Sequence, residues 1–314
     1  IVCGYFAGSM NSPCPSCLRG KQFSLKAMNQ TSNQPDSPVT HALSFDIEDW
    51  FHMVEIDAVA DPEKWDDFPS LVDRYTRWIL DTLATANTRA TFFMLGWIAE
   101  QHPHLAPLIA EGGHEVACHS FWHRRVDQMS PEEFRDDTQR TKQLLETQIG
   151  KPVIGYRAPT FSITPGAEWA FDVLLDLGFR YDASLFPARR AHGGYPCPQA
   201  AHDFRGLPSG RTIRELPMSI YQWGPVKLPF SGGGYLRLLP SWVIRRGFAS
   251  FESRNLPVVT YLHPRDFAVD CPRVPMPWIR KFKSYTGLAS TKGKLQMMLR
   301  NYRFDTCGSV AGIR

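Results

Sequence analysis

The stretch His41-Ala-Leu-Ser-Phe-Asp46-Ile-Glu48-Asp49-Trp50 joins an apolar run to three acidic residues at its end. The apolar run predicts a buried strand over residues 41–46. Three carboxylates within four residues would repel one another unless a cation neutralises some of them. The stretch therefore predicts a strand that ends at a metal site, and an acidic turn capping the next helix is the alternative.

Downstream of this strand, apolar runs alternate with helix-length amphipathic segments. A helix is expected after Ser70, because Leu71, Tyr75, Trp78, Ile79 and Leu83 share one face at the helical period. Ser130, Pro131 and Glu133 form a capping-box pattern that starts another helix, which ends at Gly150. Further strands are expected at residues 89–95, 114–119, 153–158, 179–183 and 257–263, with helices near 97–111, 164–178 and 241–254. This alternation predicts a parallel, barrel-like α/β domain.

Three regions differ in composition. Residues 1–40 are rich in Ser, Asn, Gln, Pro and Gly, and we expect a flexible leader, with Met28 as a natural start. Residues 41–270 form the predicted barrel, and the Pro- and Gly-rich residues 186–235 within it predict long rim loops. Residues 271–314 form a basic C-terminal segment, packed on the barrel or extending from it.

Two histidines separated by three residues, His119 and His123, follow the predicted third strand. On one side of a helical turn, two such imidazoles can hold a single ion. Together with one carboxylate they leave coordination positions open, which suits a Lewis acid that activates water. Zn²⁺ fits this ligand set best, and Co²⁺, Ni²⁺ or Fe²⁺ are alternatives. A purely structural role for both histidines is the competing interpretation.

Two further strand ends carry candidate residues. Arg157 leaves the strand at 153–158 and could orient a carboxylate through a bidentate contact, or form a plain structural ion pair. His263 ends the strand at 257–263 and could protonate a leaving amine. Strand carboxyl ends converge at one mouth of a parallel barrel, so these distant residues are expected to meet.

These elements, in this order, resemble the polysaccharide deacetylases of the NodB-homology type, carbohydrate esterase family 4, over residues 41–265. The resemblance implies a distorted (β/α)₇ barrel with elaborated rim loops. It also implies that Asp46 is the catalytic base, that Arg157 supports it and that His263 is the acid. His119 and His123 would bind the metal, and Asp182-Ala-Ser184 resembles a further family motif. The family's adjacent Asp-Asp-Gly is replaced by Asp46-Ile-Glu48-Asp49, so Asp49 is the preferred third ligand and Glu48 the alternative.

The motif Asp46-Ile-Glu-Asp-Trp-Phe51, the run Gly232-Gly-Gly-Tyr-Leu-Arg-Leu-Leu-Pro240 and the basic tail resemble the branch associated with exopolysaccharide and PEP-CTERM gene clusters. An N-acetylated glycan or a lipid-linked sugar is therefore the expected substrate, and acetate the expected product. A small cyclic amide or ureide is the second candidate substrate, and a non-catalytic glycan-binding protein is the third hypothesis. Aromatic residues expected to touch substrate are Trp50, Phe161 and Tyr235, and a backbone N–H near Phe161 is a candidate donor to the oxyanion.

Charge and cysteine content indicate which partners and which cellular location to expect. The formal charge is only +4, yet residues 271–304 carry eight Lys or Arg and no Asp or Glu. This basic segment suggests peripheral contact with membrane phospholipids, or simply a solvated helix, and nucleic acid is not an expected partner. Seven irregularly spaced cysteines and the absence of a long apolar run favour a soluble cytoplasmic protein over a disulfide scaffold.

Overall fold

A mixed β-sheet forms the centre of the molecule. The computed structural model describes residues 38–54, 56–189 and 194–313. Within them nine strands share the sheet, in the order β10-β1-β2-β3-β4-β5-β7-β6, and β11 pairs in parallel with the start of β1. The strands span Thr40–Ile47 (β1), Thr91–Met94 (β2), Glu115–Cys118 (β3), Gly155–Tyr156 (β4), Tyr181–Asp182 (β5), His202–Phe204 (β6), Ile213–Glu215 (β7), Val259–Leu262 (β10) and Arg303–Asp305 (β11).

The sheet curls into an incomplete barrel. All its pairings are parallel except that of β6 with β7. Beyond β10, Gly232 makes an isolated parallel bridge to Tyr261. A Cβ at Gly232 would lie 2.2 Å from the Tyr261 ring, so the close approach of these two backbones requires glycine. The barrel-like α/β fold predicted from the sequence is confirmed.

Strand alternation decides which side chains enter the curl. In β1, Leu43, Phe45 and Ile47 pack in the core shared with the helices, whereas Ala42 packs in a second core inside the curl. Because side chains alternate along a strand, Asp46 also faces inward. Ala117 of β3 and Tyr261 of β10 also pack inside the curl. His119 and His263 lie two residues further along the chain, so the same alternation directs them inward. The inward register therefore delivers the candidate residues to the carboxyl ends of the strands.

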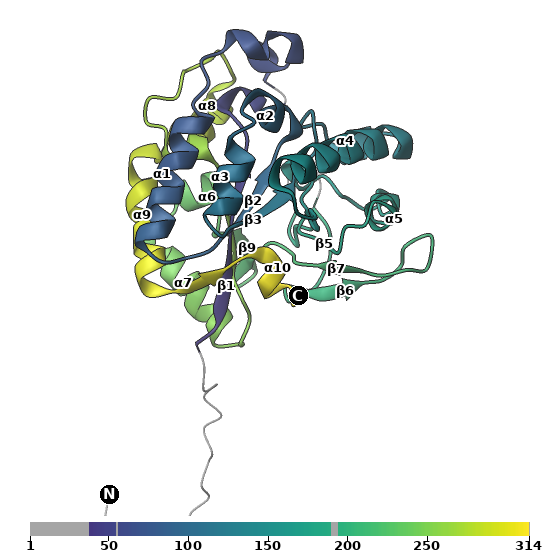
Figure 1. The fold of residues 1–314 in the computed structure, drawn as a ribbon. Helices are drawn as coiled ribbons and strands as arrows, with labels where there is room; N and C mark the ends of the chain where they lie inside the picture. The colour runs from purple at the N-terminus through teal and green to yellow at the C-terminus, as the bar shows by residue number, and fades with distance from the viewer. Residues whose placement is uncertain (1–37, 55, 190–193, 314) are drawn as a thin grey trace, which may run out of the picture. The chain divides into compact units, whose positions relative to one another are not determined.

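Helices cover the outside of the curl (Figure 1), except that Cys307 of α10 and Ala311 after it pack in the second core inside it. The capping box predicted at Ser130 is present and starts α4. The helix expected near 97–111 is split at His102-Pro103, because proline cannot continue a helix, and the helix expected from Thr164 begins at Trp169. The helices are α1 (Val72–Thr85), α2 (Gly96–Gln101), α3 (Leu105–Glu111), α4 (Pro131–Ile149), α5 (Trp169–Asp176), α6 (Gly233–Leu238), α7 (Ser241–Glu252), α8 (Trp278–Tyr285), α9 (Leu288–Asn301) and α10 (Cys307–Val310).

Several elements were not expected from the sequence. The rim segment 186–235 contains β6, β7 and a separate hairpin of β8 (Ile220–Trp223) and β9 (Val226–Pro229). The basic C-terminal segment folds as α8, α9, β11 and α10, and β11 joins the central sheet. Within the described part of the chain, no helix has the length and apolar character needed to cross a bilayer. The described cysteines Cys118, Cys197, Cys271 and Cys307 are free, and residues 1–37 of the expected leader lie outside the described residues.

Candidate metal and acid–base site

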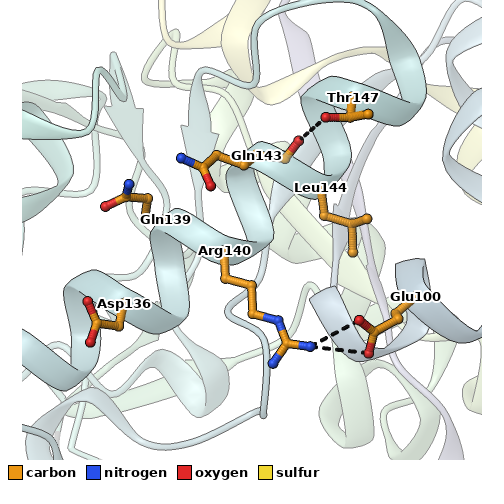
Figure 2. Close-up of a pocket in the computed structure, with 7 residues that line it drawn as sticks. All are labelled: Glu100, Asp136, Gln139, Arg140, Gln143, Leu144 and Thr147. Carbon is orange, nitrogen blue, oxygen red and sulfur yellow. Dashed lines mark hydrogen bonds and ion pairs between the residues drawn. The ribbon is translucent and has the colours of Figure 1, made fainter.

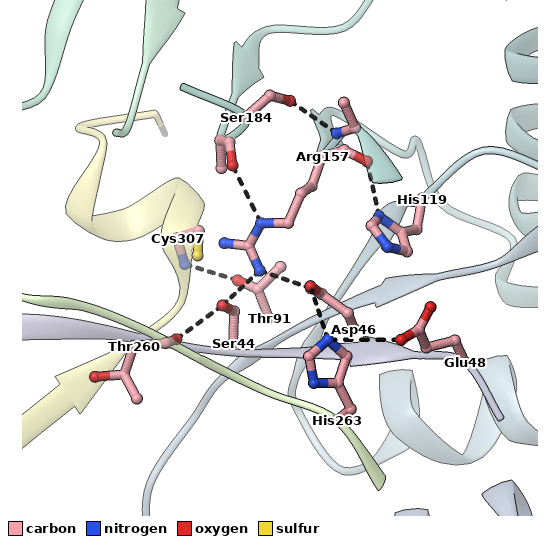
Figure 3. Close-up of polar contacts among 12 residues, drawn as sticks. Ser44, Asp46, Glu48, Thr91, His119, Arg157, Ser184, Thr260, His263 and Cys307 are labelled. Carbon is pink, nitrogen blue, oxygen red and sulfur yellow. Dashed lines mark hydrogen bonds and ion pairs between the residues drawn. The ribbon is translucent and has the colours of Figure 1, made fainter. Parts of the chain in front are cut away.

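A buried ion pair joins the first and fourth strands of the curl. The Nη1 of Arg157 lies 2.6 Å from Oδ1 of Asp46 and donates a 2.8 Å hydrogen bond to the Ser44 hydroxyl (Figure 3). Its Nε donates to the Ala183 carbonyl at 3.1 Å, and its guanidinium carbon lies 4.0 Å from the centroid of the Phe93 ring. Arg157 is fully buried, so these contacts fix the position of the Asp46 carboxylate.

Three buried side chains beside Asp46 form a candidate metal site. Ligand atoms of Glu48, His119 and His123 lie within 4.8 Å of one another. Nε2 of His123 is 2.6 Å from Oε2 of Glu48, and this carboxylate oxygen is buried without a hydrogen bond. His119 donates from Nδ1 to the Arg157 carbonyl at 2.8 Å, which leaves its Nε2 as the free ring nitrogen. One carboxylate and two imidazoles whose ligand atoms lie this close together fit a divalent transition metal.

The charge states of this group also suit metal binding. Burial would raise the pKa of Glu48, but the neighbouring histidines, His123 above all, outweigh burial and hold that pKa well below its usual range. Burial lowers the pKa of His119 to about 4, so this imidazole is neutral at physiological pH. A carboxylate and a neutral imidazole are the forms that coordinate metal ions.

The His119–His123 segment is a tight loop, which corrects the expected helical turn. Ser120 and His123 have φ angles of 66° and 54°, in the left-handed region. The loop is held by Asp137 of α4, whose buried carboxylate accepts from the backbone N–H groups of Phe121 and Trp122 at 2.8 and 3.1 Å. The strained loop brings the two ring centroids to 5.3 Å.

Asp49 occupies a structural position, which corrects the sequence-based preference for it as the third ligand. Its Oδ2 accepts from the Ser70 hydroxyl at 2.6 Å and from the backbone N–H groups of Leu71 and Val72 at 2.9 and 3.2 Å. Its Oδ1 accepts from the N–H of Trp50 at 2.8 Å. Both oxygens of Asp49 therefore accept hydrogen bonds from backbone or hydroxyl groups, at the start of α1 and at Trp50. The geometry favours Glu48 as the ligand.

A second charged pair lies opposite Asp46. His263 places Nε2 3.8 Å from Oδ2 of Asp46 and 3.6 Å from Oε1 of Glu48. Its Nδ1 lies 2.9 Å from Oδ2 of Asp266, whose other oxygen lies 2.9 Å from Nε of Arg237. Burial alone would lower the pKa of His263, but Asp266 chiefly, with Glu48 and Asp46, raises it to about 9. The imidazole is therefore protonated at neutral pH and can act as an acid.

The aromatic residues predicted to touch substrate are placed differently from one another. Trp50 is buried, donates from its indole N–H to the Pro69 carbonyl and packs against Phe51 and Phe68, so it is a core residue and not a sugar platform. Phe161 is buried, and its N–H donates to the Ala158 carbonyl at 3.0 Å, which removes that group as an oxyanion donor. Tyr235, at 39% exposure, remains accessible.

A cavity of about 270 Å³ adjoins the candidate metal site. It is lined by His123 and His52 among others, and by Trp65 and Trp122, whose ring centroids lie 6.2 Å apart. His52 accepts a hydrogen bond from the N–H of Asp49 on Nδ1, and burial lowers its pKa to about 3. Figure 2 shows the side chains that line a separate pocket outside this site, Glu100 of α2 and, from α4, Asp136, Gln139, Arg140, Gln143, Leu144 and Thr147.

Sequence reasoning missed Asp266, Arg237 and the cavity tryptophans. A signal for Asp266 was present, because His263-Pro-Arg-Asp266 has proline at the first turn position and an acid three residues after the cap. The structure forms that capping box, with the N–H of His263 donating to Asp266 at 2.9 Å. No local pattern pairs Arg237 with Asp266, because the two meet only through packing of α6 against the turn after β10.

Comparison with protein families places two adjacent models on the chain. Residues 64–181 match the polysaccharide deacetylase model, and residues 183–312 match a domain of unknown function (DUF3473). A peptidoglycan-N-acetylglucosamine deacetylase of Bacillus cereus is 35% identical over 104 residues, which is 33% of this chain and 35% of that protein. The deacetylase PgdA of Listeria monocytogenes is 36% identical over 86 residues, which is 27% of this chain and 18% of that protein. The chain thus spans about a third or less of the length of these curated relatives.

Solved structures support the fold. A Mycobacterium smegmatis protein assigned to the polysaccharide deacetylases superposes with a TM-score of 0.56 at 21% identity, covering 88% of this chain and 91% of that one. The allantoinase Puue gives a TM-score of 0.60 at 11% identity over 88% of this chain and 91% of that one, a likeness of fold alone. Residues 64–181 therefore match the polysaccharide deacetylases in sequence, and the two solved structures share the fold of the chain.

Proposed function

We propose that the protein is a metal-dependent N-deacetylase that hydrolyses acetamido groups of a bacterial exopolysaccharide or its precursor and releases acetate. One observation carries the proposal. The Arg157–Asp46 pair and the Asp266–His263 pair face each other across less than 4 Å, directly beside the three candidate metal ligands. A base, an acid and a divalent-metal site in one buried cluster are the groups that amide hydrolysis needs.

Each side chain has a distinct part in the reaction. Asp46, oriented by Arg157, accepts a proton from the attacking water, whose oxygen adds to the acetyl carbonyl carbon. A divalent cation held by Glu48, His119 and His123 would polarise that carbonyl and acidify the water. His263, protonated and oriented by Asp266, then donates its proton to the sugar nitrogen as the C–N bond breaks.

The cavity beside His123 supports a sugar substrate. Trp122 lines it and is only partly buried, and pyranose rings pack well against such an aromatic face. We propose that this cavity receives the sugar that carries the acetamide. Trp122→Ala should then raise KM several-fold with little change in kcat, because it removes contact area and no reacting group.

Zinc is the proposed metal, and the exopolysaccharide substrate rests on the resemblance of the motifs around Asp46 and Gly232. The four free described cysteines fit the cytoplasmic location predicted from the sequence, which stays a prediction. A substrate precursor assembled inside the cell would be available there.

Acetate release is the direct test. Purified full-length protein, either chelated or reloaded with Zn²⁺, Co²⁺, Ni²⁺ or Fe²⁺, is incubated with N-acetylated oligosaccharides, nucleotide sugars and a cyclic ureide. We expect acetate from an N-acetylated sugar only with metal, and none from Glu48→Ala. Hydrolysis of the ureide alone, or acetate release that survives chelation, would contradict the proposal.

A further inference from the structure

We propose that α8 docks the protein onto an anionic lipid surface, with the mouth of the candidate site at the same end of the molecule. Three large apolar side chains of this helix are exposed: Trp278 (76%), Ile279 (51%) and Phe282 (53%). Side chains of this size are rarely left in water together unless a surface covers them. The inference rests on the proposed function only for its consequence, namely that the substrate is a lipid-linked sugar.

The arrangement of residues around α8 is that of an interfacial helix. At 100° per residue, Trp278, Phe282 and Ile279 fall within one 100° arc, and the exposed Lys281 and Lys283 flank that arc on its two sides. An apolar strip with basic residues on both sides suits insertion between headgroups, because the lysines reach lipid phosphates while the apolar side chains enter the acyl boundary.

Internal packing fixes α8 and leaves the apolar strip unused. Tyr285 is buried and donates from its hydroxyl to the Pro272 carbonyl at 3.1 Å. The Nη atoms of Arg237 donate to the carbonyls of Lys283 and Ser284 at 2.7 and 2.8 Å. The helix is therefore held by its last turn, and the strip on its first turns is presented outward on a rigid support.

The same contacts tie α8 to the candidate site. Arg237, which holds the end of α8, also contacts Asp266, the partner of His263. Arg280 donates to the carbonyl of Val54, which lines the cavity beside His123. Figure 1 shows α8 at the end of the sheet toward which β1 runs, where the strand carboxyl ends carry the site. A membrane that contacts α8 would thus lie close to the site's opening.

Charge selects anionic lipid over a second copy of the chain. Residues 271–304 hold eight basic and no acidic residues, so two copies facing each other through α8 would bring like charges together. A layer of acidic headgroups offers the opposite charge to the exposed Arg273, Lys281 and Lys283, and each basic residue near such a surface adds to binding.

Vesicle co-sedimentation tests the proposal. Full-length protein is mixed with vesicles of phosphatidylcholine alone or with about one-third phosphatidylglycerol, at low and high salt. We expect binding to the anionic vesicles that weakens as salt screens the charges. The triple variant Trp278→Ser, Ile279→Ser, Phe282→Ser should bind at least about 100-fold more weakly, and Lys281→Glu with Lys283→Glu at least about 30-fold more weakly.

A matched control uses the chain's other exposed tryptophans. Trp223 (48% exposed) and Trp242 (58% exposed) lie on β8 and α7, with ring centroids 6.0 Å apart. Trp223→Ser with Trp242→Ser should bind vesicles like the wild type. Loss of binding in this control with retention in the triple variant, absence of wild-type binding, or equal binding to neutral vesicles would overturn the proposal. So would a dimer in sedimentation velocity that the triple variant abolishes without any effect of lipid.

Activity on a soluble substrate separates this proposal from the proposed function. Acetate release from a soluble N-acetylated oligosaccharide should be unchanged in the triple variant, because none of its three side chains touches the site. Vesicle binding without acetate release from any substrate would count against the proposed function and leave the lipid surface standing. Acetate release without vesicle binding would count against the lipid surface and leave the proposed function standing.

Discussion

Two regions of the candidate site each use a histidine, in opposite charge states. His119, on the metal side, is buried, and burial outweighs the attraction of Asp46 and Glu48 for its proton and lowers its pKa to about 4. His263, across the site, is equally enclosed, but Asp266 outweighs burial and its pKa rises to about 9. One imidazole is therefore a neutral candidate ligand and the other a candidate acid, and the difference comes chiefly from the Asp266 carboxylate.

The two regions also differ in their family match. His119 and His123 fall within residues 64–181, which match the polysaccharide deacetylase model, whereas His263 and Asp266 fall within residues 183–312. The latter region is described only as a domain of unknown function. Here it supplies β10, the His263–Asp266 pair and Arg237 to the same curl. It thus completes the candidate site, and separating the two matched regions would divide it.

Removing the metal side should have the largest effect. Glu48→Ala takes away the one carboxylate among the three candidate ligands, so we expect bound metal to be lost and acetate release to fall by at least about 10³-fold. Metal content by mass spectrometry and acetate release are measured on the same sample. If the variant keeps stoichiometric metal, Glu48 is not a ligand, and the metal-binding role proposed for the region around His119 is wrong.

Asp46 lies between the two regions, and its loss should reduce turnover without removing the metal. Asp46→Asn keeps a side chain of the same shape with an oxygen that can contact Arg157, but removes the proton acceptor. The kcat should therefore fall by about 10²–10⁴-fold. Metal content should stay at the wild-type level, which distinguishes this variant from Glu48→Ala. Wild-type turnover in the Asn variant would remove Asp46 from the role of base.

Asp266→Asn tests the origin of the His263 charge through pH dependence. In the wild type, His263 carries its proton below a pKa of about 9, so activity that depends on this acid is lost as pH rises through that value. Without the Asp266 carboxylate the pKa should fall toward or below the ordinary 6.5, and the alkaline limb of the kcat–pH profile should move to lower pH. At pH 7.5 we expect about a tenfold loss or more.

The Asp266→Glu variant provides the matched control. Its carboxylate can still approach Nδ1 of His263, so part of the alkaline shift should be restored. An unchanged profile in Asp266→Asn would show that Asp266 does not set the charge of His263.

The sequence predicted the positions that depend on periodicity. Asp46, His119, Arg157 and His263 follow strand ends, and a parallel α/β pattern makes such ends converge. It could not separate Glu48 from Asp49, because both acids follow the same strand and only the later path of the chain, at Ser70 to Val72, engages Asp49. Arg237 and the hairpin of β8 and β9 were missed for a related reason, since tertiary packing of a Pro- and Gly-rich segment leaves no periodic signal.

Asp49 gives the smallest expected effect on activity and the sharpest contrast with Glu48, its neighbour in sequence. Asp49→Asn keeps one oxygen but places an amide group against hydrogen-bond donors at the start of α1, so the free energy of unfolding should fall by about 1–3 kcal/mol. Urea denaturation measures this loss. Metal content and kcat should stay near wild type, because the carboxylate serves α1 and not the candidate metal. A variant that is stable but lacks metal would exchange the roles of the two acids and restore Asp49 as the ligand.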